Sequence, residues 1–173
     1  MEYILRTFSR KLLADTLTPV NIYLKLRDVF AGSLLLESSD YHGHENSLSF
    51  ICCDPIASFT AQGSTVQQRY PDDTVVADEV TRKGQVGEML EAFRKTIVPP
   101  PQSGKYSTCG LFGYMAYDAI RYFEDIELTL RDQTIPDVLY KLYRYVIVID
   151  HFSNELSLFE HCWEGSRECR STL

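Results

Sequence analysis

The sequence predicts an α+β protein in which antiparallel β-sheets pack face to face and helices flank them. Short apolar segments with the alternation or continuity typical of strands recur along the chain, and turn residues separate them. A few segments carry helical spacing instead, and residues 85–98 are the clearest of these. The sequence contains no internal repeat, and 173 residues suit one domain with a single core.

Composition excludes several classes of function. The hydrophobic fraction of 45% and the charged fraction of 24% are ordinary for a soluble globular protein. The net charge of −7 is spread along the chain, and no basic face of the kind that nucleic-acid binders carry is visible. No apolar run approaches the roughly 20 residues that span a bilayer, and the N-terminus does not resemble a signal peptide. We therefore expect a cytoplasmic protein that binds neither nucleic acid nor membrane.

The cysteines also favour the cytoplasm. They number five and form no C-x-x-C motif, so a disulfide scaffold is not expected. Cys52, Cys53 and Cys109 are predicted to be small buried hydrophobic residues, and Cys162 and Cys169 to be more exposed. The spacing of cysteines and histidines matches no zinc pattern, so we predict no metal site.

The first third of the chain predicts a helix between two strands. Residues 3–8 alternate as an opening strand. Thr18 and Pro19 are a typical helix start, with a capping hydroxyl before a proline, and Gly32 is a typical stop. Residues 34–36 predict a short buried strand, and residues 41–47 predict a polar loop.

The next segment predicts a β-meander. Residues 48–53 and 56–61 are expected to form two consecutive strands, separated by Asp54 and Pro55. Gly63 then marks a turn into a strand over residues 65–70. An apolar stripe predicts a helix over residues 85–98, and three prolines at 99–101 end it.

Residues 109–124 change from an extended to a helical pattern. Gly110 and Gly113 bracket an apolar pair, and a glycine within a strand permits close approach of another backbone or marks a bend. We therefore predict a strand that passes through a glycine-marked bend into a short helix at the centre of the domain. Asp118 and Arg121, three residues apart, predict a local ion pair on the helix surface rather than a general acid.

The chain ends in a predicted hairpin. Residues 138–150 and 155–161 are expected to form its strands, with a turn between them. Beyond Trp163 the tail is charged, and it contains neither a helix cap nor a further apolar segment.

The residues alone do not predict a self-sufficient enzyme. The glycine pair lacks the third glycine and the lysine of a phosphate-binding loop, and no serine lies in a G-x-S-x-G motif. A soluble binding or regulatory domain is the prediction from residue chemistry.

Several short motifs, taken together, carry more information about function than the single residues do. They are Thr18-Pro19-Val20, Leu35-Leu36-Glu37-Ser38, Ser49-Phe50-Ile51, the segment from Gly110 to Tyr114, Tyr117-Asp118, the segment from Arg121 to Glu124, and Ile135-Pro136-Asp137. In this order they resemble the N-terminal lobe of anthranilate synthase component I, a chorismate-using enzyme family. Each motif is weak alone, and the set is specific over nearly the whole chain, from about Ser9 to the final hairpin.

The resemblance implies a non-catalytic part of a lyase. The family makes anthranilate from chorismate and ammonia, with magnesium, at the first committed step of tryptophan synthesis, and a glutamine amidotransferase subunit supplies the ammonia. Its catalytic and magnesium-binding residues lie in a C-terminal chorismate-binding lobe that these residues do not include. The resemblance thus implies one N-terminal lobe over residues 1–163, a truncated tail over 164–173, no cofactor on this chain, and no activity by this chain alone.

The resemblance also implies a feedback site for L-tryptophan at Glu37 and Ser38, with Ser49 on the following strand. A carboxylate beside a hydroxyl at a strand end can hold the ammonium of the amino acid by a charge-assisted hydrogen bond. Many members carry a lysine or arginine where this chain has Leu48, so this sequence departs from the pattern where the inhibitor carboxylate would lie.

The face that meets the missing lobe is expected around the central stretch. Its predicted residues are Gly110, Phe112, Gly113, Tyr114, Tyr117, Asp118 and Arg121. Two alternatives stay open. One is the N-terminal lobe of aminodeoxychorismate synthase component I of the folate pathway, and the other is a structural interaction domain without a ligand.

Overall fold

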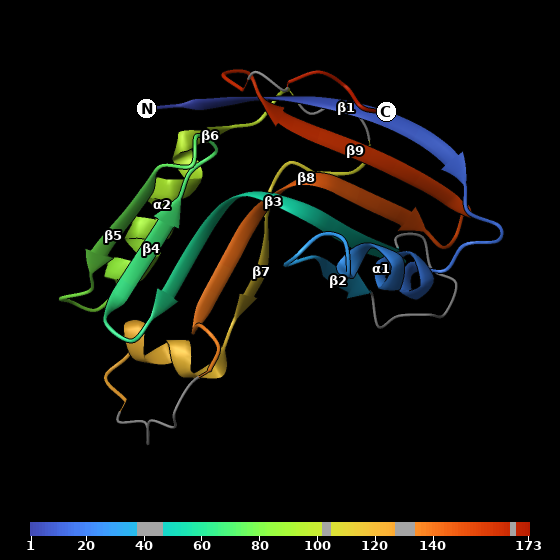
Figure 1. Ribbon diagram of the computed structural model, residues 1–173. Helices are drawn as coiled ribbons and strands as arrows, with labels where there is room; N and C mark the ends of the chain where they lie inside the picture. The colour runs from blue at the N-terminus through green and yellow to red at the C-terminus, as the bar shows by residue number, and fades with distance from the viewer. Residues whose placement is uncertain (38–46, 102–104, 127–133, 167–168) are drawn as a thin grey trace.

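The computed structural model describes residues 1–37, 47–101, 105–126, 134–166 and 169–173 (Figure 1). Strands dominate it, and the predicted α+β class is confirmed. In chain order the elements are β1 (Tyr3–Leu13), α1 (Pro19–Arg27), β2 (Leu34–Glu37), β3 (Leu48–Gln62), β4 (Thr65–Arg69), β5 (Val75–Glu79), α2 (Gln85–Thr96), β6 (Ile97–Val98), β7 (Leu111–Met115), the 3₁₀ helix η1 (Tyr117–Tyr122), β8 (Val138–Asp150) and β9 (Glu155–Trp163).

The described strands belong to one connected sheet rather than to two separate ones. Their order is β5-β4-β3-β8-β9-β1-β6, with β2 added to β3 and β7 added to β8. The pairings are antiparallel except that of β1 with the short β6. β3 and β8 pair from Leu48 opposite Asp150 to Ala61 opposite Val138, and Figure 1 shows both long strands curving from one half of the sheet into the other. The two packed sheets that the sequence predicted are therefore one bent sheet, and β3 and β8 run through its bend (Figure 1).

The bend lies where the sequence predicted a break. Asp54 has a φ of 60°, and the register between β3 and β8 shifts between Pro55 and Ala57. Such a β-bulge bends a strand without ending it, and it can hold a proline that would interrupt a regular ladder. The two strands predicted over 48–53 and 56–61 are thus one strand, and Asp54-Pro55 is its bulge.

Helix boundaries agree with the local signals at their starts and differ at their ends. The Thr18 hydroxyl accepts a hydrogen bond from the backbone N–H of Asn21 at 3.2 Å, as its predicted capping role requires. α1 nevertheless ends at Arg27, before Gly32, whose φ of 77° lies in the following turn. α2 ends at Thr96, because the next two residues extend to pair with β1.

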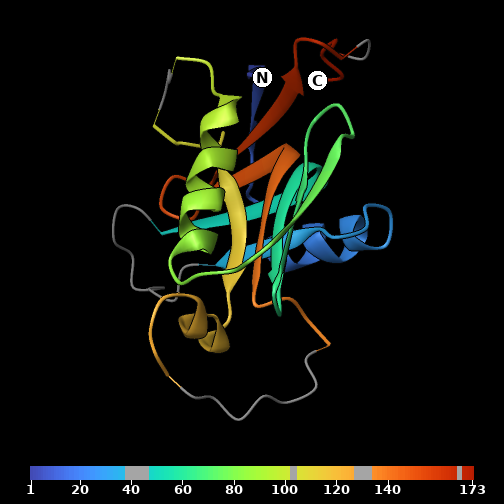
Figure 2. The same ribbon diagram turned by 90° about the vertical axis from the view of Figure 1, so that its left-hand side faces the viewer.

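Apolar clusters fill both sides of the sheet. On one side, α2 places Val86 and Phe93 against Ala57 and Phe59 of β3, and the two phenylalanine rings lie 5.9 Å apart. Figure 2 shows α2 lying in front of this half of the sheet. No helix among the described residues covers the opposite side of β3 and β8 in this half (Figure 2).

The other half of the sheet has both faces covered in the described chain. α1 packs Ile22 and Leu26 against a cluster that contains Ile51. Across the sheet, Tyr106 and Phe112 pack against a second cluster, which contains buried residues of β3 and β8. The first two residues of β2, Leu34 and Leu35, therefore pack against one apolar cluster each, whereas Leu36 and Glu37 at its end are exposed, so the strand predicted to be buried is only half-buried.

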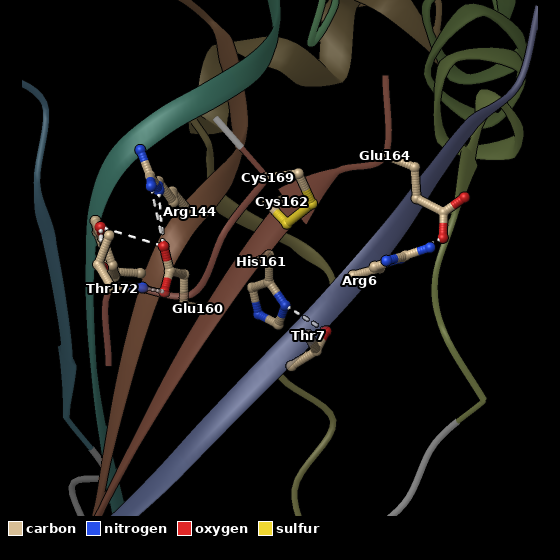
Figure 3. Close-up of a disulfide and its surroundings, with 10 residues drawn as sticks. Arg6, Thr7, Arg144, Glu160, His161, Cys162, Glu164, Cys169 and Thr172 are labelled. Carbon is tan, nitrogen blue, oxygen red and sulfur yellow. Dashed lines mark hydrogen bonds and ion pairs between the residues drawn. A yellow bond between two sulfur atoms is a disulfide. The ribbon is translucent and has the colours of Figure 1, made fainter. Parts of the chain in front are cut away.

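The predicted exposure of the cysteines was right for Cys52, Cys53 and Cys109 and wrong for Cys162, whereas Cys169 is half-buried. Cys52 and Cys53 are buried and Cys109 is half-buried, and burial raises the pKa of the Cys52 thiol to about 12 and of the Cys53 and Cys109 thiols to about 11. Cys162 is also buried, and it forms a disulfide with Cys169 (Figure 3). The tail turns back on β9 after Trp163, and the sequence analysis did not predict this turn or the disulfide within it (Figure 3).

No helix in the described ranges is long and apolar enough to cross a membrane.

Candidate functional site

Glu37 is the last residue of β2 and pairs directly with Ser49 of β3. Side chains of directly opposed residues in an antiparallel pair lie on the same face of the sheet. The Glu37 side chain is exposed at the end of its strand. The prediction that Glu37 ends a strand beside the one that holds Ser49 is therefore confirmed, whereas Ser38 lies outside the described residues.

Ser49 is buried, and its hydroxyl already has a partner. Only 1% of the residue is exposed, and Oγ lies 2.7 Å from Nε2 of His151. The backbone N–H of His151 donates to the carbonyl oxygen of Ser47 at 3.0 Å. His151 comes from the β8–β9 turn, 102 positions away. The sequence analysis did not single it out as part of this site, because no local pattern joins the two residues.

An apolar floor lies on the same face as Glu37 and Ser49. Leu35 on β2 and Ile51 on β3 are paired and occupy this face, two positions along from Glu37 and Ser49. Ile22 and Tyr23 of α1 pack against the same cluster. An exposed carboxylate thus stands at the edge of an apolar surface, an arrangement suited to a small molecule with a cationic group and an apolar body.

Leu48 lies on the opposite face of β3. It is opposite Asp150 of β8, and it packs with Phe50, Tyr106 and Phe112. Because adjacent residues of a strand point to opposite faces, Leu48 points away from the face of Ser49 and Glu37. The position where the resemblance implied a cation is therefore part of an apolar cluster in this chain.

Asp150 anchors the chain that covers that opposite face. Its Oδ2 accepts hydrogen bonds from Lys105 Nζ at 2.7 Å and from the Tyr106 hydroxyl at 2.8 Å. Its Oδ1 accepts from the backbone N–H groups of Phe152 and Ser153. Burial acts to raise the pKa of Asp150, but these hydrogen bonds outweigh it and hold the pKa well below its usual range. The carboxylate fixes the β8–β9 turn that carries His151.

The central stretch folds as predicted, from strand into short helix, and one of its two glycines is required. A Cβ built on Gly113 would lie 1.9 Å from the carbonyl oxygen of Leu139 in β8. A Cβ built on Gly110 would meet nothing within 4 Å. The predicted close approach of another backbone is confirmed at Gly113.

Arg121 has a partner that the sequence did not predict. The predicted surface pair was with Asp118, whereas the structure directs the Arg121 guanidinium to Asp137, whose side chain is fully buried. The Tyr122 hydroxyl donates to the same Oδ2 atom at 2.6 Å, and so does the Gly63 N–H at 3.3 Å. Asp137 therefore ties η1 to the start of β8 and to the β3–β4 turn.

The predicted lobe-facing aromatic residues are not buried within this chain. Tyr117 is 82% exposed, and Phe112 and Tyr114 are half-buried. The Phe112 ring lies 5.9 Å from that of Phe50 and 6.5 Å from that of Tyr143. Phe112 and Tyr114 alternate with Gly113 along β7, so they occupy the face of the sheet turned away from α2.

Further polar groups surround the disulfide (Figure 3). The buried Glu160 accepts hydrogen bonds from Arg144 at 3.0 Å and from the backbone N–H of Thr172 at 2.8 Å. Burial acts to raise the pKa of Glu160, but these bonds outweigh it and hold the pKa below its usual range. The tail is thus held on β9 by a covalent bond and by hydrogen bonds.

His161, next to the disulfide, is held neutral. Its Nε2 lies 3.1 Å from the carbonyl oxygen of Thr108, which can only accept, so Nε2 carries the proton. Nδ1 then accepts from the Thr7 hydroxyl at 2.8 Å. Burial lowers the pKa of His161 to about 4. This histidine is a satisfied core residue and not an acid–base group at neutral pH.

Two cavities lie away from Glu37. One of about 180 Å³ is lined by the prolines at 99–101 and by Cys109, and one of about 240 Å³ adjoins Arg144 and Cys162. The residues that the structure describes include no group of three or more histidine, cysteine, aspartate or glutamate side chains that could hold a metal ion.

Comparison with known proteins gives a consistent result. The family model of the chorismate binding enzymes matches residues 32–173. Anthranilate synthase component 1 of Mycobacterium tuberculosis is 32% identical over 168 residues, which cover 92% of this chain and 32% of that protein. The protein of the same name from Mycolicibacterium smegmatis is 31% identical over 172 residues, covering 92% and 30%, and that from Thermus thermophilus is 29% identical over 155 residues, covering 89% and 32%. The chain spans about a third of the length of these curated relatives.

Proposed function

The chain belongs to the chorismate binding enzyme family, and from this premise we propose that it is the N-terminal, feedback-regulatory lobe of an anthranilate synthase component I. In this role it binds L-tryptophan and docks on a chorismate-binding lobe. The matched relatives are named anthranilate synthase component 1, which supports the anthranilate branch over the aminodeoxychorismate branch. The observation that carries the effector site is the pairing of Glu37 with Ser49 at an exposed strand end.

The ammonium group of tryptophan is the part of the ligand that this chain is best suited to hold. Glu37 offers an exposed carboxylate at the end of β2, and a charge-assisted hydrogen bond to it would fix the amino end of the ligand. The hydrogen bond between the Ser49 hydroxyl and His151 ties β3, the strand paired with Glu37, to the β8–β9 turn. The apolar surface of Leu35 and Ile22 lies on the same face, and the indole ring of the ligand can pack against it.

Leu48, the described residue where the resemblance implied a cation, offers the carboxylate of tryptophan no charged partner. Leu48 carries no charge, and it points to the opposite face among apolar residues. In the proposed arrangement, the cation that meets the ligand carboxylate comes from the chorismate-binding lobe. We therefore expect this chain alone to bind tryptophan weakly or not at all.

Catalysis is assigned to the other lobe. The full enzyme of this proposal forms anthranilate from chorismate, with ammonia from a glutamine amidotransferase subunit. Magnesium, which the family resemblance implies for that reaction, finds no fitting set of ligands among the described residues, so no step on this chain is derived through it.

Docking of the two lobes is proposed through the uncovered face of β7 and the neighbouring 3₁₀ helix. The exposed ring of Tyr117 and the half-buried rings of Phe112 and Tyr114 give this face an apolar character. Exposed aromatic surface is typical of interaction sites.

The proposal is tested by joining this chain to the part of the Mycobacterium tuberculosis relative that follows its matched region. We expect this fusion protein to form anthranilate from chorismate and an ammonium salt, and L-tryptophan to inhibit it. Calorimetric titration should detect tryptophan binding to the fusion protein and little or none to the chain alone. An active fusion protein that shows no heat and no inhibition at millimolar tryptophan would contradict the effector role.

A further inference from the structure

Lys141 of β8 lies in the middle of the sheet face that α2 does not cover. It is directly opposite Phe112 on β7 and Ser58 on β3, and Ser58 is in turn opposite Arg69 on β4. The flanking residues Ala57 and Leu142 point the other way, into the cluster with α2. Two cations and an aromatic ring thus share one row across this face.

The Lys141 ammonium is partly withdrawn from solvent. It lies against Gly32, since a Cβ built on that glycine would be 2.5 Å from Nζ. The carbonyl oxygen of Gly32 accepts a hydrogen bond from the Tyr143 hydroxyl at 3.0 Å, which holds the loop against β8. The side chain of Lys141 is half-buried at this corner of the bent sheet.

No acidic group neutralises this ammonium within the described chain. Lys141 makes no hydrogen bond and no ion pair to any described residue, whereas Arg69 is paired with Asp73 and donates to the carbonyl oxygen of Pro55 at 2.6 Å. Burial, and then repulsion from Arg69, lower the pKa of Lys141. A half-buried cation without a partner is unfavourable, and a carboxylate placed beside it would relieve that cost.

We propose that Lys141 is a docking cation that receives a carboxylate side chain from the chorismate-binding lobe. This inference rests on the proposed function, because the partner is the region that the curated relatives have beyond the third matched by this chain. The half-buried Phe112, Tyr114 and Leu139 lie beside Lys141 on the same face. Their apolar surface suits a protein partner whose aspartate or glutamate is surrounded by apolar residues, as at the centre of a stable interface.

A small free anion suits this place less well than a protein carboxylate. Arg69 is already paired with Asp73 and with the carbonyl oxygen of Pro55, so of these two cations only the Lys141 ammonium would be left to bind the anion here. The apolar side chains beside Lys141 would not replace the hydrogen bonds that a hydrated anion loses on binding. A protein partner gains both the charge-assisted hydrogen bond and the burial of the aromatic rings.

Carbodiimide cross-linking of the fusion protein tests the pairing directly. The reagent activates a carboxyl group, and a lysine amine in contact with it forms an amide as the urea leaves. We expect mass spectrometry to find Lys141 joined to an aspartate or glutamate of the chorismate-binding lobe. Cross-links between lobes from other lysines but none from Lys141 would overturn the role of Lys141 and leave lobe docking intact. An inactive fusion protein with no cross-link between lobes would overturn lobe docking and this inference with it.

Lys141→Met provides a second measurement, with Lys25→Met on the exposed face of α1 as the matched control. In the chain alone, removal of a half-buried charge that has no partner among the described residues should leave the melting temperature unchanged or raise it. In the fusion protein, the same change should lower the melting temperature, and Lys141→Arg should restore it. Equal shifts in the two proteins would overturn the inference, because they would assign Lys141 a role within this chain alone.

Discussion

Gly113 and Leu139 lie so close that a Cβ on the glycine would be 1.9 Å from the leucine carbonyl oxygen. Real Cβ atoms do not approach a backbone oxygen to this distance, so only glycine permits β7 to pair with β8 at its observed spacing. This contact sets the position of the strand that leads into η1 and carries the uncovered aromatic rings.

Gly113→Ala should therefore destabilise the chain strongly. The neighbour that must move is backbone, and overpacking of a tight site costs about 1–3 kcal/mol or more. Gly110→Ala is the matched control, since its Cβ would meet nothing within 4 Å and its φ is not positive. Urea unfolding monitored by circular dichroism measures both variants. Equal stability of the two would show that β7 can separate from β8 without penalty.

Asp137→Asn should also reduce stability, through a different cause. The carboxylate is fully buried and pairs with Arg121, whose side chain is 18% exposed. Loss of one partner leaves the other charge buried and unpaired, which typically costs about 3–5 kcal/mol. Glu88→Gln removes one partner of the exposed pair with Arg82 and should change the unfolding midpoint little. If Asp137→Asn is no worse than Glu88→Gln in urea unfolding, Asp137 does not have the structural role described here.

How far the sequence predicted the fold depended on how local each signal is. The cap at Thr18, the strand-to-helix change after Gly113 and the end of β2 at Glu37 follow from residues that are neighbours in sequence, and each was predicted. The bulge at Asp54 was mistaken for a break, because the same residue types end strands and bend them. β5 was missed because its side chains are all exposed, so it lacks the apolar alternation that marks a half-buried strand.

The parts of the candidate site that were missed depend on contacts between distant residues. Arg121 was predicted to pair three positions away, and its buried partner Asp137 is 16 positions away. His151 reaches Ser49 only because β8 and β3 lie side by side. Such partners are set by sheet register, which no short motif encodes.

The pH dependence of stability should report the buried His161. Its folded pKa of about 4 lies below the ordinary value of 6.5, so between these values the unfolded chain binds a proton that the folded chain does not. The contribution of neutral His161 to the free energy of unfolding is therefore fully present above about pH 6.5. It is lost as the pH falls towards 4, and it amounts to on the order of 3 kcal/mol. His161→Gln can keep both hydrogen bonds without titrating, and we expect a flatter profile over this range. An unchanged slope in the variant would assign the acid sensitivity to other groups.

The disulfide between Cys162 and Cys169 should be detectable by thiol counting. Denatured chain should expose three thiols before treatment with dithiothreitol, from Cys52, Cys53 and Cys109, and five after it. The sequence separation is seven, and closing so short a loop contributes about 2 kcal/mol to stability in the chain-entropy description. Cys169→Ser should lower stability by about that amount in oxidised protein and have little effect in reduced protein. Five thiols without reductant would contradict the bond.

The effector site is tested most directly by Glu37→Ala in the fusion protein. If the carboxylate holds the tryptophan ammonium, its loss should weaken tryptophan inhibition roughly 10- to 100-fold, as expected for a hydrogen bond to a charged group. The rate of anthranilate formation should stay close to that of the parent, because Glu37 is assigned no part in catalysis. Glu79→Ala is the matched control, since Glu79 is likewise an exposed glutamate at the last position of a strand. It should leave inhibition unchanged. Equal inhibition of Glu37→Ala and parent would remove Glu37 from the site, whereas loss of both inhibition and activity would assign Glu37 a structural role at the end of β2.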